Sequence, residues 1–563
     1  MSPNLKHSLS AALALALVAG VPAHAQSLPY GSTSGDAADE EEDGASGRAA
    51  RPGKKVEITP YIEAGQVVLA EFSPGSDVMT YSVVAAGLDA EIRGRNNAGS
   101  LSIRYERAFG WGDAGNSDTI SGVARFSAAV VPQALTIEAG ALAARTEISG
   151  NGASVLQPLG ARDSATQVYA LYAGPSLRTR SGDVEFEGHY RIGYAKVESP
   201  DAVAVAPGGA AVDVFDEAVV HNAAIHVGSR AGELLPVGIG VGAGYNREDV
   251  SNLDQRVEDF HVRGDVAVPV TADLQLVGGV GWEKVEVSNR DAVRHSITGL
   301  PVVGSDGRFV TDESAPRVLA FETEGLIWDA GVVWRPSRRT ALEAHVGKRY
   351  GSTTYYGSFA WAPTRNSAVN VSVYDGITGF GGQVTSALAA LPTSFQAARN
   401  PITGELNGCV VSQESGSCLS GALGSVRSSV FRSRGVMATY GADLGKLQTG
   451  FGVGYDRRKF IGAPGTILAL ANGTIDENVW LAAYLNGQID RNSSFATNFY
   501  STWFQSGDSS AGDLSAIGAS AAYRRNLTSR LSATAALGVS GLERDGLEDF
   551  WSGSASLGVR YSF

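Results

Sequence analysis

Apolar and polar side chains alternate with a period of two along most of the chain from residue 56 onward. In the clearest stretch, residues 184–194, apolar residues or glycine occupy every second position, and the positions between them include Glu185, Glu187, His189 and Arg191. Side chains point alternately to the two faces of a strand, so this pattern predicts strands with one apolar and one charged face. Such strands, about ten residues long, are typical of transmembrane β-barrels, although a soluble sandwich gives the same alternation.

The lengths of the connections distinguish these two folds. We delimit about 20–22 candidate strands, and short and long connections alternate between them along the chain. Residues 269–272 and 490–493 are short connections, whereas 147–164, 288–317 and 376–433 are long. Outer-membrane barrels have short periplasmic turns, longer outer loops and an even number of strands. We therefore predict an all-β fold: one transmembrane antiparallel β-barrel with both chain ends in the periplasm.

The amino-terminal part of the chain differs in composition from the rest. Residues 1–25 combine Lys6, an apolar core and an Ala23-His24-Ala25 cleavage motif, which predicts a secretory signal peptide cleaved near Ala25. Residues 26–55 contain an acidic run at 39–43 and almost no bulky apolar side chains, so we predict a disordered periplasmic arm. No later change in composition marks a boundary, and residues 56–563 are assigned to a single barrel in the outer membrane.

Composition and motifs exclude several classes of function. A net charge of −13 provides no basic patch for nucleic acid. The sequence contains neither H-E-x-x-H nor G-x-S-x-G, and its 8 histidines are scattered without metal-ligand spacing. We predict no enzymatic activity, no cofactor and no metal.

The carboxy-terminal strand carries its own signal. Leu557, Val559, Tyr561 and Phe563 fall on one face of a strand that ends in an aromatic residue. This strand resembles the closing strand of bacterial outer-membrane barrels, where the terminal phenylalanine is part of the signal read by the barrel-assembly machinery. The resemblance implies that this machinery and outer-membrane lipid are partners of the chain.

A second resemblance rests on residues 334–375. This run starts with W-x-P-x-x-R-T-x-L, continues with G-x-R-Y and ends with a T-x-N-S turn before S-V-Y-D. It resembles the outer-membrane β-barrel family found beside exosortase (PEP-CTERM) and exopolysaccharide gene clusters. The resemblance implies a role in exporting or securing surface polymers, with polysaccharide export components as possible partners, and it implies no catalytic residue.

Charged residues on the non-apolar strand faces are the candidates for lining the lumen. In a water-filled pore they would tune selectivity, and in a wide barrel they would also brace the wall through cross-strand ion pairs. We further expect tryptophans near strand ends, among them Trp282, Trp334 and Trp480, to form interfacial girdles. The lumen candidates are Asp89, Glu91, Arg93, Arg104, Glu106, Glu185, Glu187, His189, Arg191, His261, Arg263, Asp265, Glu343, His345 and Arg349.

The longest loop, residues 376–433, holds both cysteines. Cys409 and Cys418 are predicted to form a disulfide in the oxidising envelope, and residues 384–398 are apolar enough to predict a short helix despite Pro392. The loop would either fold into the lumen as a plug or pack over the outer rim. The sequence thus favours a channel or an export conduit for surface polymer, with a porin or uptake channel for small solutes, or a structural or adhesive barrel, as alternatives.

Overall fold

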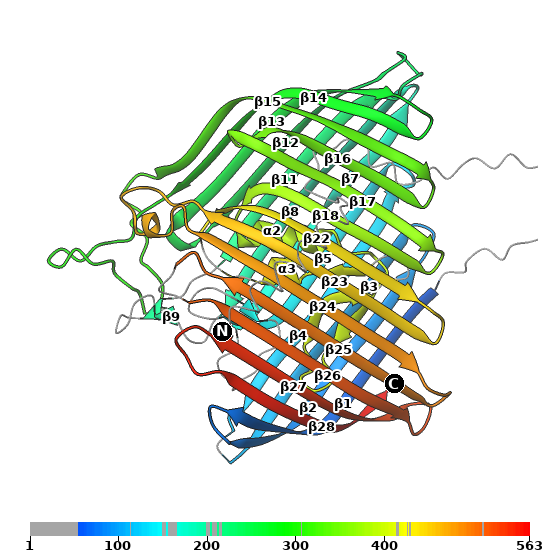
Figure 1. The fold of residues 1–563 in the computed structure, drawn as a ribbon, viewed down its shortest axis with the longest axis vertical. Helices are drawn as coiled ribbons and strands as arrows, with labels where there is room; N and C mark the ends of the chain where they lie inside the picture. The colour runs from blue at the N-terminus through cyan, green and yellow to red at the C-terminus, as the bar shows by residue number, and fades with distance from the viewer. Residues whose placement is uncertain are drawn as a thin grey trace, which may run out of the picture.

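The computed structural model describes residues 55–112, 114–148, 154–155, 166–198, 203–204, 211–212, 217–305, 307–411, 416–424, 426, 429–508 and 512–563. The predicted signal peptide and all but the last residue of the predicted arm lie outside the described residues. The remainder forms an antiparallel ring of 22 strands, which confirms the predicted all-β barrel (Figure 1).

The strands follow one another around the ring in chain order, and each pairs with its neighbours. Pairing of the last strand with the first, from Tyr61–Ser562 to Ala70–Gly553, closes the ring and leaves no free sheet edge. The strands are β1 (Lys55–Ser73), β2 (Val78–Arg93), β3 (Asn97–Trp111), β4 (Ser117–Val131), β5 (Leu135–Ile148), β7 (Thr166–Ser181), β8 (Val184–Glu198), β11 (Glu217–Ser229), β12 (Gly238–Val250), β13 (Gln255–Pro269), β14 (Leu274–Asn289), β15 (Val318–Ser337), β16 (Thr340–Arg349), β17 (Ser352–Thr364), β18 (Ser367–Thr378), β22 (Phe431–Asp443), β23 (Leu447–Phe460), β24 (Ile475–Gln488), β25 (Ser493–Gln505), β26 (Leu514–Asn526), β27 (Leu531–Arg544) and β28 (Phe550–Ser562).

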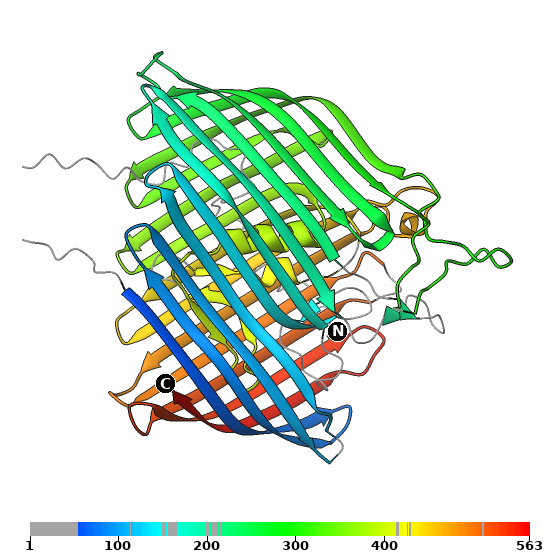
Figure 2. The same ribbon diagram turned by 180° about the vertical axis from the view of Figure 1, so that it is seen from behind.

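The two ends of the barrel differ in their connections, as the sequence predicts. The turn end carries short turns, the start of β1 and the end of β28 (Figure 1). Its tightest turns span two residues, as at 182–183, where Gly182 adopts a φ of 59° that favours glycine. The loop end carries the long connections, and loop 290–317 projects away from the barrel there (Figures 1 and 2).

The outer face of the wall is apolar. Large side chains such as Val280, Leu326 and Leu537 point outward, with 56%, 62% and 67% of their surface exposed. In lipid every backbone polar group must find a partner within the protein, and a closed ring with an apolar exterior meets that requirement. Within the described residues, no helix is long and apolar enough to cross a membrane.

The tryptophans divide between the two faces. Trp282 and Trp334 are exposed on the outer face, where an interfacial girdle would lie. Trp480 is only 4% exposed and lies on the buried, inward side of β24, so its predicted place in the girdle is wrong. The period-two pattern explains the difference, because Trp480 shares its face with the buried Asn478 and Ala482.

The connection between β18 and β22 enters the barrel, and Figure 2 shows its helices behind the strands of the near wall. We call residues 379–430 the inserted segment. It contains α2 (Phe380–Ala389), β19 (Gln396–Arg399), β20 (Leu406–Val411), β21 (Gly416–Cys418) and α3 (Ser420–Leu423).

The predicted bounds of this loop and of its helix are wrong. The loop is shorter than 376–433, because Thr378 and Phe431 still pair directly across β18 and β22. The helix spans Phe380–Ala389, so it starts before residue 384 and ends well before residue 398. Pro392 accounts for this end, since proline has no N–H to donate and disfavours helical backbone in the residue before it.

Leu537 tests the assignment of the outer face. Because it lies at the middle of β27, Leu537→Arg is expected to lower the free energy of unfolding from a lipid bilayer by about 2–4 kcal/mol. Leu537→Ala, which shortens the side chain without adding charge, is the control and should cost clearly less. Denaturant titration in phospholipid vesicles measures both. Equal stability of the two variants would contradict a lipid-facing Leu537.

Candidate functional site: the lumen and its inserted segment

Helix α2 packs against one half of the lumen wall. It lies against β5, β7, β8, β11 and β12, and Phe380, Val384 and Leu388 on the helix are fully buried in a cluster with apolar wall residues. The wall residues that face the helix are small. A Cβ atom added to Gly193 would lie 2.9 Å from Thr385 Cγ2, so glycine permits the close approach of the helix. An apolar core thus holds helix α2 of the inserted segment against the inner wall of the barrel.

A wall carboxylate holds the start of this helix. Glu248 on β12 is completely buried and accepts hydrogen bonds from the backbone N–H groups of Gly379 (2.6 Å) and Gly382 (3.0 Å). It also accepts one from Thr378 Oγ1 at 3.0 Å. The first N–H groups of a helix have no partner within the helix and carry partial positive charge, so a carboxylate is well suited to this position.

Polar contacts fasten the middle of the segment to β2 and β3. Ser394 Oγ donates to Glu91 at 2.9 Å and accepts from Arg93. On β3, Ser100 Oγ donates to the carbonyl of Thr393 and accepts from the N–H of Phe395, both at 3.1 Å. These contacts place two predicted lumen residues, Glu91 and Arg93, against the inserted segment.

Arg399 on β19 anchors the segment further along the wall. Its guanidinium donates to Ser121 Oγ on β4 at 2.7 Å and to Ser102 Oγ on β3 at 3.1 Å. It also donates to the carbonyl of Gly404 within the segment at 2.9 Å. All of these acceptors are uncharged oxygens, and within the described residues Arg399 forms no direct ion pair.

The segment also reaches β23 and β24. Gln383 Nε2 donates to Asp456 at 3.2 Å, and Arg458 donates to the carbonyl of Gly421 at 3.0 Å. A Cβ on Gly421 would lie 2.9 Å from the indole nitrogen of Trp480, which shows that this tryptophan adjoins α3.

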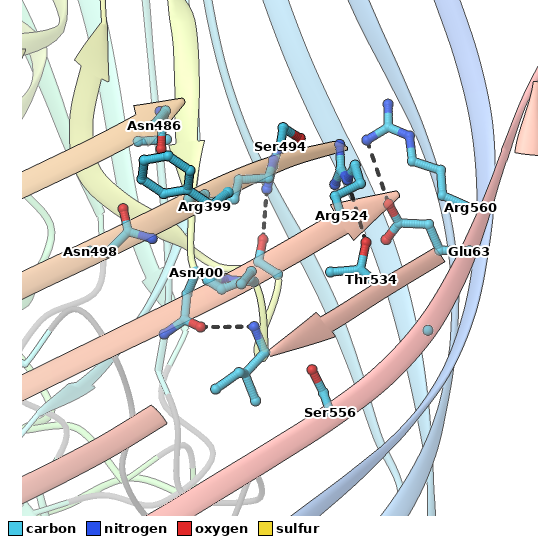
Figure 3. Close-up of a pocket in the computed structure, with 18 of the residues that line it drawn as sticks. Glu63, Arg399, Asn400, Asn486, Ser494, Asn498, Arg524, Thr534, Ser556 and Arg560 are labelled. Carbon is cyan, nitrogen blue, oxygen red and sulfur yellow. Dashed lines mark hydrogen bonds and ion pairs between the residues drawn. The ribbon is translucent and has the colours of Figure 1, made fainter. Parts of the chain in front are cut away.

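The rest of the lumen holds a cavity of about 620 Å³ beside β19. Its wall comes from the other side of the ring, mainly β24 to β28 and β1, and its remaining boundary is the stretch 396–404 of the inserted segment. Figure 3 shows Arg399, Asn486, Asn498, Arg524, Ser556 and Arg560 around it. The inserted segment therefore covers the wall from β5 to β12, reaches the opposite wall through Ile402, and leaves a space beside it that polar and apolar residues line.

The alternation places all predicted lumen residues on the inner face of the wall, where many of them brace it. One network joins Arg349 to Asp259 and to Glu283, each at 3.0 Å. A second joins Asp329 to Arg263 at 2.7 Å and to His345 at 2.8 Å. Such cross-strand pairs fit the bracing interpretation, whereas a role in selectivity stays a prediction for these residues.

The other predicted lumen residues have varied partners. Asp89 and Arg104 line the cavity. The remaining pairs are Arg104–Glu106 (2.8 Å), Glu185–Arg230 (2.5 Å), Glu187–Arg178 (2.5 Å), His189–Asn222 (2.8 Å), Arg191–Glu138 (3.4 Å), His261–Asp259 (3.4 Å), Asp265–His226 (3.2 Å) and Glu343–His345 (3.2 Å).

Two further predictions concern the cysteines and the last strand. Cys409 and Cys418 are direct partners in the backbone register of β20 and β21, but their side chains lie outside the described part of the structure, so the disulfide stays a prediction. Leu557 and Phe563 are exposed on the outside of the last strand, and Tyr561 packs edge-on against Phe563. Recognition by the assembly machinery also stays a prediction.

Sequence reasoning missed Glu248, Arg399, Arg524 and Arg560. Arg560 alternates with the apolar residues of the last strand, so the same period-two argument could have found it. Glu248 binds the start of a helix 131 residues away, so no sequence pattern around Glu248 predicts its role. Among the described residues, no group of three or more His, Cys, Asp or Glu side chains could hold a metal ion.

Glu248 is the clearest test of how the segment is held. Glu248→Ala leaves two buried N–H groups without an acceptor, and we expect docking of α2 to weaken by about 1–3 kcal/mol. Hydrogen exchange of residues 380–389 should then speed up, with Glu248→Gln intermediate. Asp249→Ala, the adjacent carboxylate on the opposite strand face, is the control and should leave this exchange unchanged. Unaltered exchange in Glu248→Ala would refute the anchoring role.

No protein-family model and no curated protein matches the sequence. Among solved structures, the chain is similar to the FrpB iron transporter from Neisseria meningitidis (F5-1 variant), with 10% identity, coverage of 90% of this chain and 82% of that chain, and a TM-score of 0.41. It is similar to the ferric-catecholate import receptor Fiu of E. coli K12, with 10% identity, coverage of 89% and 81%, and a TM-score of 0.41. It is also similar to the siderophore receptor PiuA of Acinetobacter baumannii, with 8% identity, coverage of 91% of this chain and 82% of that chain, and a TM-score of 0.38.

Proposed function

We propose that the protein is a constricted conduit across the bacterial outer membrane, which passes a polar cargo along one side of its lumen. The observation that carries this proposal is the asymmetry of the lumen. An apolar core seats helix α2 on the wall from β5 to β12, and a cavity of about 620 Å³, whose lining includes several charged and amide side chains, lies mainly along β24 to β28 and β1.

The width of the ring supports a conduit. Eight strands already enclose a side-chain-filled interior, whereas barrels of about 16–22 strands enclose a channel or a plugged lumen. A segment held against one side of such a channel narrows it. Solutes can then pass while the segment stays inside the barrel. The apolar seat of α2 favours a constriction that stays in place over a plug that is expelled.

The outer membrane as location is supported by three features of this chain. Its exterior is apolar around a closed ring, its first 25 residues have the pattern of a signal peptide, and its last strand ends in an exposed aromatic residue. In lipid, a closed ring is needed because every backbone N–H and C=O group must find a partner within the protein. A signal peptide is needed for export through the inner membrane.

Two cargo classes follow from different observations. Surface polymer, such as exopolysaccharide, is the narrower form of the proposal and rests on the resemblance of residues 334–375. Uptake of small solutes is the second candidate, because the cavity volume falls in the range of about 300–1,000 Å³ typical of small-molecule sites. Polymer retained in the periplasm of a deletion strain would support export. A sharp size cutoff in liposome swelling would support small solutes.

Removal of the inserted segment tests the conduit directly. Since Thr378 and Phe431 are direct partners, residues 379–430 can be replaced by a short Asn-Gly turn that keeps β18 and β22 in register. We expect the wild type to conduct in a planar bilayer and the variant to conduct several times more, because the constriction is gone.

The matched control shortens an external loop instead. Ala292 and Thr311 are paired in loop 290–317, so residues 293–310 can be replaced by the same turn. Conductance should stay at the wild-type value, because this loop projects outside the lumen. If the folded wild type and the segment deletion are both silent, the protein is not a conduit.

A further inference from the structure

The cavity beside the inserted segment carries an excess of positive charge. Two acidic side chains line it, Glu63 and Asp89, against five basic ones: Arg104, Arg399, Lys446, Arg524 and Arg560. We propose that this cavity is a binding site for a hydroxylated carboxylate, such as a sugar acid, alone or as a unit of a chain. This inference rests on the proposed function, in which the cavity lies on the path of the cargo.

The two acidic side chains are already engaged. Asp89 accepts from Arg560 at 2.9 Å, and Glu63 pairs with Arg104 and, at 3.5 Å, with Arg560. Arg104 also pairs with Glu106 at 2.8 Å. These pairs neutralise Arg104 and Arg560 within the wall, so the excess charge lies on the other basic residues.

Arg524 carries the clearest part of that excess. Among the described residues it forms no ion pair, and its guanidinium makes one long hydrogen bond, 3.4 Å to Thr534 Oγ1. Figure 3 shows it between Ser494 and Arg560, facing the cavity. Arg560 lies nearby, and the two positive charges repel each other. This repulsion disfavours the charged form of Arg524 unless an anion binds there.

Arg399 faces the same cavity from the inserted segment. Its hydrogen-bond acceptors are serine and backbone oxygens, and its Nε is buried without a partner among the described residues. The terminal nitrogens of Arg399 are already engaged, so Arg399 adds positive charge from the side of the segment, whereas Arg524 offers a guanidinium group from the wall. The planar guanidinium group can bind a carboxylate through two parallel hydrogen bonds.

The neutral lining indicates the rest of the ligand. Amide and hydroxyl side chains both donate and accept, so they match neighbouring hydroxyl groups better than apolar surface. Of the two aromatic residues in the lining, Tyr61 and Phe495, the ring of Tyr61 is already covered by Arg560 at 3.5 Å from its centre. The neutral polar residues that line the cavity include Asn486, Gln488, Ser494, Asn498, Thr534 and Ser556.

The test uses the full mature chain in a planar bilayer, with galacturonate as the probe and galactose as its neutral counterpart. Galacturonate should reduce the current of the wild type, and galactose should not. Arg524→Gln should raise the half-blocking concentration of galacturonate about tenfold, since it removes a charge-assisted hydrogen-bond donor. Arg525→Gln removes the same charge from the opposite face of β26 and should leave the block unchanged.

The remaining arms separate the alternatives. Stronger block by trigalacturonate than by the monomer identifies chain-borne units as the ligand, and equal block identifies the free sugar acid. Inorganic phosphate blocking as well as galacturonate would overturn the proposal in favour of a plain anion site. A channel that conducts without any block would overturn it while leaving the conduit intact. Equilibrium dialysis of radiolabelled galacturonate against the detergent-solubilised chain tests binding even if no current flows, and absence of bound galacturonate there would also overturn it.

Discussion

The pairing of β1 with β28 is the constraint on which the rest of the structure depends. It joins the two ends of a 22-strand sheet, so that every strand has two neighbours and no edge is left unpaired. Closure fixes which face of each strand points outward and which points into the lumen. It also creates an interior too wide for wall side chains to fill, and the chain partly fills that interior with its own residues 379–430.

The interior is divided into two unlike halves. On one side, small wall residues such as Gly193, Ala195 and Ala218 let helix α2 approach closely, and Glu248 satisfies the N–H groups at the start of the helix. Apolar residues on an inner wall would be unfavourable in water, and the helix removes them from it. On the other side Ile402 of the inserted segment packs against Val67 and Ala522, and beside this contact arginine, amide and hydroxyl side chains line the cavity.

Local features of the sequence were enough to predict the barrel. Strand periodicity is readable within a single strand, and the alternation of short turns with long loops is readable over a few consecutive hairpins. The interior was not predictable in the same way. The role of Glu248 depends on a contact 131 residues away. The apolar composition of residues 384–398 predicts a helix through Pro392, but the helix ends at Ala389 because proline cannot continue it. Trp480 was assigned by residue type rather than by its strand face, which was readable from the sequence.

We propose that the lumen is open to solutes at the cavity beside β24 to β28 and closed along β5 to β12, where helix α2 is seated. Chemical modification of single cysteines, introduced into a reconstituted parent chain that carries Cys409→Ser and Cys418→Ser, tests it most directly. Ser556→Cys lies at the cavity, whereas Ala170→Cys lies under the segment. A bulky, charged, membrane-impermeant thiol reagent should modify Ser556→Cys quickly and reduce its current, and leave Ala170→Cys and the cysteine-free parent unmodified. Equal modification at both positions, or modification of Ala170→Cys alone, would contradict the account.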